Sequence, residues 1–429
     1  MGRCLNIAFI VNDFPCVSET FILNQITGLL ELGNKVRIFA YEKVNDLQKQ
    51  HAEVSKYDLL NKTEYFAPIP QKRPARALKF LRILSRLAIR RPAWISRCLQ
   101  FKKYGVYESL NHLFLLEPFM RENYDIIHCQ YGTIGKNFIY LKEIMDTKIF
   151  TSFRGYDLTR FVKENGPSVY EELFKRGDAF LPVCDYFARR LRELGCPPER
   201  IHIHYSGIDT TKFAFRDRQI DDRGIKILTV GRLTEKKGLE YSIRAVARLV
   251  ARYPAIPYII AGEGPLRPQL EDLICKLGME KHVHLAGSLP AEEIKELLNN
   301  AHIFVLASVT AESGDQEGIP GSLKEAMATG LPVIATRHSG IPELVQDGVS
   351  GFLIPERDVD ALAGKCEYLI SHPQRRAEMG RAGRKFVEEN FEISKLNREL
   401  VELYTRSLET LDGAPRAKAR GTRFTPTRP

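Results

Sequence analysis

Glu317 and Glu325 flank a stretch that suits a ligand carrying both phosphate and hydroxyl groups. Between them, Pro320 fits the first position of a helix, where its missing N–H costs nothing. The amides of Gly321 and Ser322 would then be free at the helix start, and such amides bind anions. A nucleotide sugar is one ligand of this kind. The alternative is a surface loop followed by an ordinary amphipathic helix.

Two other turns follow predicted strands and suit the same kind of ligand. The turn after strand 225–230 contains Arg232 and Lys237, which can neutralise a diphosphate. Strand 258–261 precedes a turn whose glycines let the backbone approach a base or ribose closely, and this turn reads Gly262-Glu-Gly264-Pro265-Leu266. Because the carboxyl ends of parallel strands meet at one sheet edge, these turns and the two glutamates should converge. Each turn alone is equally compatible with a solvated loop.

The first half of the chain has polar residues in equivalent places. Strand 125–128 ends in His128, and strand 148–153 is followed by Arg154 and Asp157. These three side chains are therefore expected to line a ligand crevice. A lone histidine is more often structural than functional, which leaves a core role for His128 open.

The alternation of strands and helices predicts an α/β protein of two Rossmann-like, doubly wound domains that face a cleft. A strand at 5–11, a helix capped by Ser18 and a strand at 35–40 open the first domain in the order typical of such folds. The opening lacks Gly-x-Gly-x-x-Gly, which argues against a dinucleotide dehydrogenase. The expected parts are a first domain 1–206, a linker 207–224, a second domain 225–390, a C-terminal helix 391–412 that crosses back to the first domain, and a disordered basic tail 413–429.

Composition favours a cytoplasmic protein. The 429 residues are 44% apolar and 27% charged, enough for two cores, and no apolar run approaches the roughly 20 residues needed to cross a bilayer. The eight cysteines are scattered and form no Cys-x-x-Cys pair. This spacing argues against a disulfide framework or a zinc site and for reduced thiols in a cytosol.

The net charge of +10 comes from two segments. Residues 71–103 hold eleven lysines or arginines and no acid, and residues 413–429 hold five basic residues and no acid. Without those sixteen, 47 basic residues face 53 acidic ones, so the body of the protein is mildly acidic. This distribution argues against nucleic acid as a partner.

The first basic segment contains an amphipathic helix at 76–91. A helix of this kind suits an anionic membrane surface, and the tryptophan that follows it could anchor at the interface. The alternative is a surface helix that packs on the sheet and leaves its basic face in water. We favour the membrane because the segment contains no acid, and we expect peripheral attachment to the inner face of the cell membrane. The expected contacts are Arg82, Arg86, Arg90, Arg91 and Trp94.

Taken in order, the motifs of the second half resemble those of the retaining GT-B glycosyltransferases that carry a Glu-x7-Glu motif, a group described as family 4-like or group 1. The resemblance rests on Gly231-Arg-Leu-Thr-Glu-Lys-Lys-Gly238, Gly262-Glu-Gly-Pro265, Glu317 to Glu325 and His338-Ser-Gly-Ile-Pro-Glu343. A further likeness, to bacterial exopolysaccharide enzymes of the colanic-acid and amylovoran type, is carried by Phe14-Pro15, Ser18-Glu-Thr-Phe21, Leu23-Asn-Gln-Ile26, Lys175-Arg-Gly-Asp178, Ser308-Val-Thr-Ala311 and Gly314 to Pro320.

This resemblance implies a role for each motif. Glu325 would bind the ribose hydroxyls of the nucleotide, and Glu317 would bind hydroxyls of the transferred sugar. Arg232 and Lys237 would hold the diphosphate and stabilise the charge that develops as it leaves. No cofactor or metal is expected, and the single Asp-x-Asp sequence at 358–360 is expected to cap a helix. The other donor contacts would be Gly262, Gly264, Pro265, Leu266, Gly321, Ser322 and Leu323, and the first-domain cleft would present Ser18, Glu19, Thr20, His128 and Asp157.

One departure from the family pattern affects the first domain. Relatives usually carry His-Gly-x-Asp where this chain has Arg154-Gly-Tyr-Asp157. A guanidinium stays protonated and cannot act as a base, but it could stabilise phosphate or bind an anionic acceptor. The resemblance implies retaining transfer of a sugar from a nucleotide diphosphate to a lipid-linked saccharide acceptor in exopolysaccharide synthesis. The alternatives are a nucleotide-sugar-binding protein with impaired catalysis, a subunit of a polysaccharide assembly complex, or a phosphorylase, which would need a pyridoxal phosphate lysine.

Overall fold

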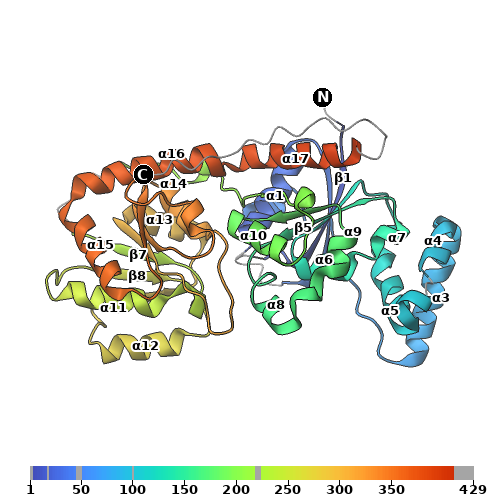
Figure 1. The fold of residues 1–429 in the computed structure, drawn as a ribbon, viewed down its shortest axis with the longest axis horizontal. Helices are drawn as coiled ribbons and strands as arrows, with labels where there is room; N and C mark the ends of the chain where they lie inside the picture. The colour runs from blue at the N-terminus through green and yellow to red at the C-terminus, as the bar shows by residue number, and fades with distance from the viewer. Residues whose placement is uncertain (1–2, 17–18, 45–50, 99–100, 218–223, 410–429) are drawn as a thin grey trace.

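The protein contains two parallel six-stranded sheets with helices on both faces (Figure 1). The computed structural model describes residues 3–16, 19–44, 51–98, 101–217 and 224–409, without the side chains of 101–104 and 106–108. The first sheet has the order β3-β2-β1-β4-β5-β6 and the second has the order β12-β11-β10-β7-β8-β9. The strands of the first sheet are β1 (Asn6–Phe14), β2 (Lys35–Lys43), β3 (Thr63–Tyr65), β4 (Ile126–Cys129), β5 (Lys148–Phe153) and β6 (Ala179–Pro182). Those of the second are β7 (Ile227–Val230), β8 (Tyr258–Ala261), β9 (Val283–Gly287), β10 (Ile303–Leu306), β11 (Val333–Thr336) and β12 (Gly351–Ile354).

Helices connect the strands in both domains. The first domain holds α1 (Thr20–Glu31), α2 (Ala52–Lys56), α3 (Arg73–Arg90), α4 (Pro92–Cys98), α5 (Phe101–Leu116), α6 (Gly132–Phe138), α7 (Leu141–Ile144), α8 (Arg160–Asn165), α9 (Glu171–Arg176) and α10 (Asp185–Glu193). The second holds α11 (Leu239–Val250), α12 (Arg267–Lys276), α13 (Ala291–Asn300), α14 (Gly321–Ala328), α15 (Val359–Ser371) and α16 (Pro373–Phe391), and α17 (Ile393–Glu409) follows.

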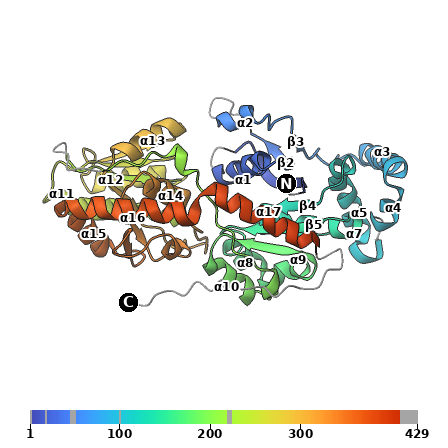
Figure 2. The ribbon, with the colours of Figure 1, turned by 90° about the horizontal axis from the view of Figure 1, so that it is seen from above.

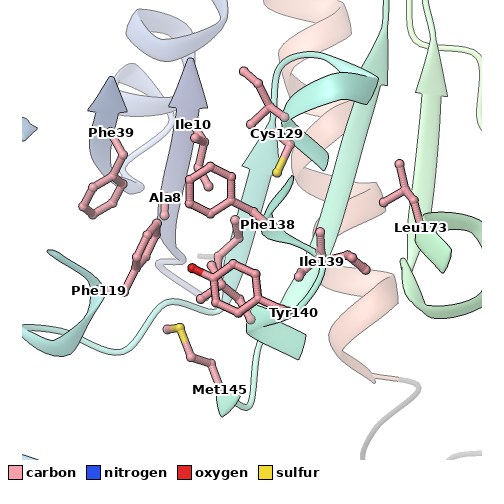
Figure 3. Close-up of a cluster of buried hydrophobic side chains, with 14 of the residues drawn as sticks. Ala8, Ile10, Phe39, Phe119, Cys129, Phe138, Ile139, Tyr140, Met145 and Leu173 are labelled. Carbon is pink, nitrogen blue, oxygen red and sulfur yellow. The ribbon is translucent and has the colours of Figure 1, made fainter. Parts of the chain in front are cut away.

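Both faces of the first sheet are buried, so its central strands carry apolar side chains on both sides. All four residues of β4 and all six of β5 are buried. One face carries an aromatic cluster in which Phe39 stacks on Phe119 with ring centroids 4.3 Å apart, and Phe138 and Tyr140 lie beside them (Figure 3). The other face is covered by α1 and by the C-terminal helix α17.

The C-terminal helix α17 packs on the first domain although it follows the second domain in the chain. Helix α16 lies over the second domain, and α17 continues from it across to the first (Figure 2). Leu400 and Tyr404 of α17 belong to the same buried cluster as Leu23 and Ile26 of α1. The Asn397 side chain donates to the carbonyl oxygen of Asn24 at 3.3 Å. The two domains are therefore joined twice, through the linker and through α17.

The basic segment contains α3 and α4, and these helices pack with α5, which follows them, at the end of the molecule farthest from the second domain (Figure 1). Helix α3 buries Ile83 and Leu87 fully, and Phe80 and Leu84 pack against the same core. Leu81 is instead 61% exposed, and Leu78 and Ile89 are 71% and 83% exposed. Helical spacing places these three side chains on one outer stripe.

Trp94 is buried, whereas a residue that anchors a protein at a membrane interface has to be exposed. The side chain is 9% exposed and belongs to the first-domain core. The Arg91 guanidinium covers its ring at 5.1 Å from the centroid. Trp94 follows α3 in sequence, but it belongs to a separate helix, α4, and is one of the buried residues of that helix. Trp94 is therefore a core residue and not a membrane contact.

Candidate functional site

Each sheet reverses its strand order at one point, and the predicted site residues gather at these points. The reversal lies between β1 and β4 in the first sheet and between β7 and β10 in the second. Ligands of open α/β sheets bind beyond the carboxyl ends of the strands at such a point. Arg232 and Lys237 follow β7, and Glu317 follows β10. On the first domain, Glu19 follows β1 and Tyr131 follows β4.

The turn after β7 places two lysines beside the Glu317 carboxylate. Lys237 ends a short 3-10 helix, and Gly238, with a φ of 60°, caps the start of α11. A Cβ at position 238 would lie 1.8 Å from the carbonyl oxygen of Ala307, so only glycine permits this close approach. The Nζ atoms of Lys237 and Lys236 lie 3.2 Å and 3.6 Å from Oε1 of Glu317.

These ammoniums decide the charge of Glu317. Burial acts to raise the pKa of its carboxyl, but Lys237 and Lys236 outweigh burial and lower the pKa to about 2, so the group is ionised at neutral pH. Despite these neighbours, Oε1 accepts no hydrogen bond of good geometry within the described part of the chain. A buried carboxylate oxygen without an aligned donor suits a hydroxyl group of a ligand.

The helix that follows Glu317 begins one residue later than expected. Pro320 has an extended ψ of 132° and precedes α14 as its cap, so the first helical residue is Gly321. The free amides of the first turn, including those of Gly321 and Ser322, lie at the strand-order reversal, where they can receive an anion. Leu323, a predicted donor contact, is fully buried in a hydrophobic cluster of the second domain.

Glu325 lies one turn into α14 with an uncompensated carboxylate. Burial raises its pKa, and the charges of Lys324 and Lys295 offset only part of that rise. Its carboxylate forms no hydrogen bond or short ion pair with any residue that the structure describes. Together with the helix amides, Glu325 offers an acceptor for hydroxyls close to an anion site.

The turns after β7 and β8 touch, as the shared sheet edge requires. The Leu233 amide donates to the carbonyl oxygen of Glu263 at 2.9 Å, and the Leu266 amide donates back to that of Leu233 at 3.1 Å. Gly262 has a φ of 150°, and a Cβ there would lie 1.9 Å from the carbonyl oxygen of Gly231. Gly264 is equally confined against Leu233, and Pro265 follows it in the turn. The structure thus brings the Arg232 turn and the Gly262 turn together.

Arg154 is held rigidly in the wall of the first domain. Its Nε donates to the carbonyl oxygen of Gln130 at 3.2 Å, its Nη1 donates to Oγ of Ser206 at 2.9 Å, and its Nη2 donates to the Gln130 side chain. The guanidinium also covers the Phe21 ring at 4.2 Å from the centroid. All three acceptors are neutral, and no described carboxylate forms an ion pair with Arg154. The residue therefore presents a fixed positive charge.

Glu19 lies near charges from both domains. Its carboxylate accepts a hydrogen bond from the Tyr131 hydroxyl. Burial raises the pKa of Glu19, and the hydrogen bond from Tyr131 and the charges of Arg154 and Arg232 offset only part of that rise. Because Arg232 belongs to the second domain, Glu19 lies within reach of charge from both domains. Thr20, the next residue, opens α1, and Ser18 lies outside the described residues.

Two predicted cleft residues have structural roles instead. His128 is fully buried, with Nδ1 at 2.6 Å from the Tyr404 hydroxyl and Nε2 at 2.8 Å from Oγ of Ser152, so neither nitrogen is available to a ligand. Asp157 is also fully buried, and its oxygens accept from the backbone amides of Arg154, Gly155 and Gly132 at 2.9 to 3.0 Å. Asp157 shapes the turn that carries Arg154.

Contacts between the domains, which the sequence did not reveal, bring the two walls together. Glu343 of the second domain accepts from the amides of Asp185 and Tyr186 at 2.8 and 3.2 Å, so it caps helix α10 of the first domain. The Tyr186 hydroxyl donates to the side chain of Gln316 at 3.0 Å. The only sequence signal was the place of Glu343 in the motif that begins at His338.

Lys324 is a second residue that sequence reasoning missed. Its side chain is buried, at 3% exposure, and its ammonium donates to the carbonyl oxygen of Ser206 at the domain junction. Burial lowers its pKa to about 8. Asp358, by contrast, caps α15 as predicted, because its carboxylate accepts from the Ala361 amide at 2.8 Å. None of the helices in the described part of the chain is long and apolar enough to cross a membrane.

Two family comparisons cover most of the chain. Residues 18–212 match the family described as Glycosyltransferase Family 4, and residues 210–386 match the family described as Glycosyl transferases group 1. A colanic acid biosynthesis glycosyltransferase named WcaL, from Salmonella typhimurium, is 39% identical over 414 residues, which cover 93% of this chain and 99% of the relative. The amylovoran biosynthesis glycosyltransferase AmsK of Erwinia amylovora is 35% identical over 412 residues, covering 94% and 100%.

Solved structures share the fold at lower identity. HepE of Anabaena, crystallised with UDP and also with UDP and glucose, has a TM-score of 0.67 at 17% and 16% identity and covers 94% of this chain and 100% of its own. Sucrose-phosphate synthase of Thermosynechococcus elongatus has a TM-score of 0.69 at 17% identity, covering 94% and 99%. With the family matches and the paired sheets, the chain belongs to the GT-B glycosyltransferases of family 4 and group 1.

Proposed function

We propose that this protein moves a sugar from a nucleotide diphosphate sugar to a lipid-linked saccharide acceptor, with retention of configuration, in exopolysaccharide synthesis. The observation that carries this proposal is Glu317, a buried carboxylate beside two ammoniums whose Oε1 has no aligned hydrogen bond. The names of WcaL and AmsK support the exopolysaccharide context. The UDP bound to HepE supports the class of donor.

In this proposal the donor lies along the second-domain wall. Glu325 accepts hydrogen bonds from the ribose hydroxyls, and the amides of Gly321 and Ser322 donate hydrogen bonds to a phosphate. Lys237 and Arg232 hold the diphosphate, so Lys237 exchanges its contact with Glu317 for a phosphate oxygen. Glu317 then accepts a sugar hydroxyl. Positive charge from these two residues stabilises the leaving diphosphate, which is the role that a metal plays in other transferases.

The bond changes require no enzyme base. The bond between the sugar C1 and the diphosphate oxygen breaks, and the acceptor oxygen bonds to C1 on the same face. The acceptor proton passes to an oxygen of the departing phosphate. Arg154, which cannot accept a proton, contributes a fixed positive charge toward a substrate phosphate or an anionic acceptor.

A donor panel tests the proposal. The protein is incubated with UDP- and GDP-sugars and lipid-linked acceptors, and the release of nucleoside diphosphate and the anomeric configuration of the product are measured. We expect one donor to be consumed with retention, and Glu317→Gln to slow transfer at least about 100-fold while the nucleotide still binds. Nucleotide binding without any transfer would favour the impaired binder, and no binding at all would refute both.

Membrane attachment is a separate part of the proposal, and the structure changes the residues expected to carry it. The outer stripe of α3, formed by Leu78, Leu81 and Ile89, is exposed beside Arg82 and Arg90, which form no ion pair with a described acid. Apolar insertion next to arginines suits an anionic leaflet. Arg86 is less available, because it pairs with Glu117 at 2.6 Å.

Vesicle flotation tests this attachment. Arg82→Gln with Arg90→Gln should weaken binding to vesicles containing phosphatidylglycerol about 30-fold, at about 1 kcal/mol for each charge. Leu81→Ser with Ile89→Ser should weaken binding to a similar degree by removing the inserted groups. Lys276→Gln with Lys385→Gln, two exposed lysines of the second domain, is the charge-matched control. Unchanged binding of both α3 variants would refute this docking face.

A further inference from the structure

The loop that carries Glu317 is held by a buried histidine. The Glu317 backbone amide donates to Nε2 of His338 at 3.0 Å. The His338 side chain is fully buried, and its other nitrogen, Nδ1, lies 2.6 Å from Oε1 of Glu356. Glu317, His338 and Glu356 follow three neighbouring strands, β10, β11 and β12. The imidazole therefore joins three adjacent loops at the carboxyl edge of the second sheet.

The partners of His338 define its tautomer. A backbone amide can only donate, so Nε2 must accept and can carry no hydrogen. The ring proton is then on Nδ1 and is donated to Glu356. His338 is thus held as a neutral imidazole in one tautomer, which is set by the hydrogen bond on the side away from Glu317.

Glu356 is itself fixed as an acceptor. Its Oε2 accepts from the Thr310 amide at 2.9 Å, and the Nη1 of Arg357 lies 3.3 Å from the same oxygen. Its Oε1 accepts from His338 and, at the longer distance of 3.5 Å, from the Thr310 hydroxyl. Oε2 therefore faces two groups that can only donate, whereas Oε1 faces the imidazole and a hydroxyl, both of which can also accept.

We propose that His338 and Glu356 are positioning residues for sugar transfer, because together they fix the backbone, and hence the carboxylate, of Glu317. This inference rests on the proposed role of Glu317 in binding the transferred sugar. The Lys237 contact with the Glu317 carboxylate is exchanged for phosphate in the proposed donor complex, whereas the His338 contact holds the Glu317 backbone and is unaffected by that exchange. A displacement of about 1 Å at such a group can lower a rate about 100-fold.

Glu356→Gln tests the tautomer with almost no change in shape. The side-chain oxygen of the glutamine should face the backbone amide of Thr310 and the guanidinium of Arg357, because both can only donate. Its NH2 group then faces His338. Nδ1 must then accept, the ring hydrogen moves to Nε2, and two hydrogens meet between Nε2 and the Glu317 amide. We expect kcat to fall about 100-fold, while the affinity for nucleoside diphosphate changes less than about threefold.

Nitrogen NMR of 15N-histidine-labelled protein measures the tautomer of His338 in the absence of a nucleotide sugar. The His338 signal is assigned by its absence in His338→Gln. We expect the wild type to carry its hydrogen on Nδ1 and Glu356→Gln to carry it on Nε2. A wild-type ring protonated on Nε2 would overturn the inference, and so would an altered tautomer with unchanged kcat. Absence of transfer by the wild type would refute the proposed function instead, and the NMR result would still stand.

A pair of substitutions separates positioning from space filling. The oxygen of His338→Gln reaches the place of Nε2 and can accept from the Glu317 amide, whereas His338→Asn reaches only the place of Nδ1. We expect His338→Gln to keep kcat within about fivefold of the wild type, and both His338→Asn and His338→Ala to lose about 100-fold. Thermal unfolding confirms that each variant is folded. Equal losses of kcat in folded Gln and Asn variants would overturn the inference.

Discussion

Replacing Glu317 by glutamine removes one negative charge from beside two lysines and keeps the size of the side chain. The Glu317 side chain is 12% exposed, and those of Lys237 and Lys236 are 11% and 13% exposed. Water therefore replaces little of the lost attraction, and breaking a buried ion pair from one side leaves the other charges uncompensated. We expect Glu317→Gln to lower the free energy of unfolding.

The size of this effect follows from the pKa of Glu317. Its folded pKa of about 2 lies below the ordinary value of 4.5. Each pKa unit corresponds to about 1.4 kcal/mol, so the ionised group contributes about 3 kcal/mol to the free energy of unfolding at neutral pH. Because the folded pKa is the lower one, this contribution is complete above pH 4.5 and is lost as the pH falls through about 2.

Urea unfolding of the wild type and the variant, followed by far-UV circular dichroism, measures this contribution. The fluorescence of Trp94, the single tryptophan, is unsuitable because Trp94 lies in the first domain and Glu317 lies in the second. We expect a difference of about 3 kcal/mol at pH 7 that is smaller by about 1 kcal/mol at pH 4. Glu312→Gln, an exposed carboxylate on the same loop, is the control. An equally stable Glu317→Gln variant, or a difference independent of pH, would refute the reasoning.

Four further substitutions have defined outcomes. Glu325→Gln should weaken nucleoside diphosphate binding about 10- to 100-fold by calorimetry without lowering stability, because its carboxylate pairs with no described residue and burial raises its pKa. The wild type should become more stable between pH 8 and pH 10.5, because Lys324 has a folded pKa of about 8 and only the unfolded chain keeps its proton in that range. Lys324→Met should abolish this rise, which urea unfolding at both ends of the range measures. Arg154→Lys should lower kcat/KM about 10-fold or more in the transfer assay, because an ammonium cannot reproduce three fixed hydrogen bonds. Tyr404→Phe should cost about 1 to 2 kcal/mol in urea unfolding by removing the partner of His128 Nδ1, with kcat/KM unchanged.

The strands and the order of the donor motifs could be predicted because both depend on neighbouring residues. Strands covered on both faces read as short apolar runs that end in turn residues, and the runs at 148–153 and 258–261 are β5 and β8. The turn glycines also carry a local signal, since Gly262 and Gly238 adopt backbone conformations that other residues rarely adopt.

The parts that could not be predicted depend on which distant element covers a given face. His128 lies near the end of a strand, as a ligand-binding histidine would. However, the hydroxyl of Tyr404, which is 276 residues away in sequence, forms a hydrogen bond with Nδ1 of its ring. The periodicity of α3 showed that the helix is amphipathic without showing that Ile83 and Leu87 face the core and Leu81 faces out. Likewise, no spacing rule connects Glu356 through His338 to Glu317.

Calorimetric titration with UDP and with GDP tests the donor site most directly. The wild type should bind one of the two nucleotides, and Arg232→Gln with Lys237→Gln should weaken that binding at least about 30-fold, because two charge-assisted contacts to the diphosphate are lost. A wild type that binds neither nucleotide, or a double variant that binds as tightly as the wild type, would contradict the placement of the diphosphate beside Glu317.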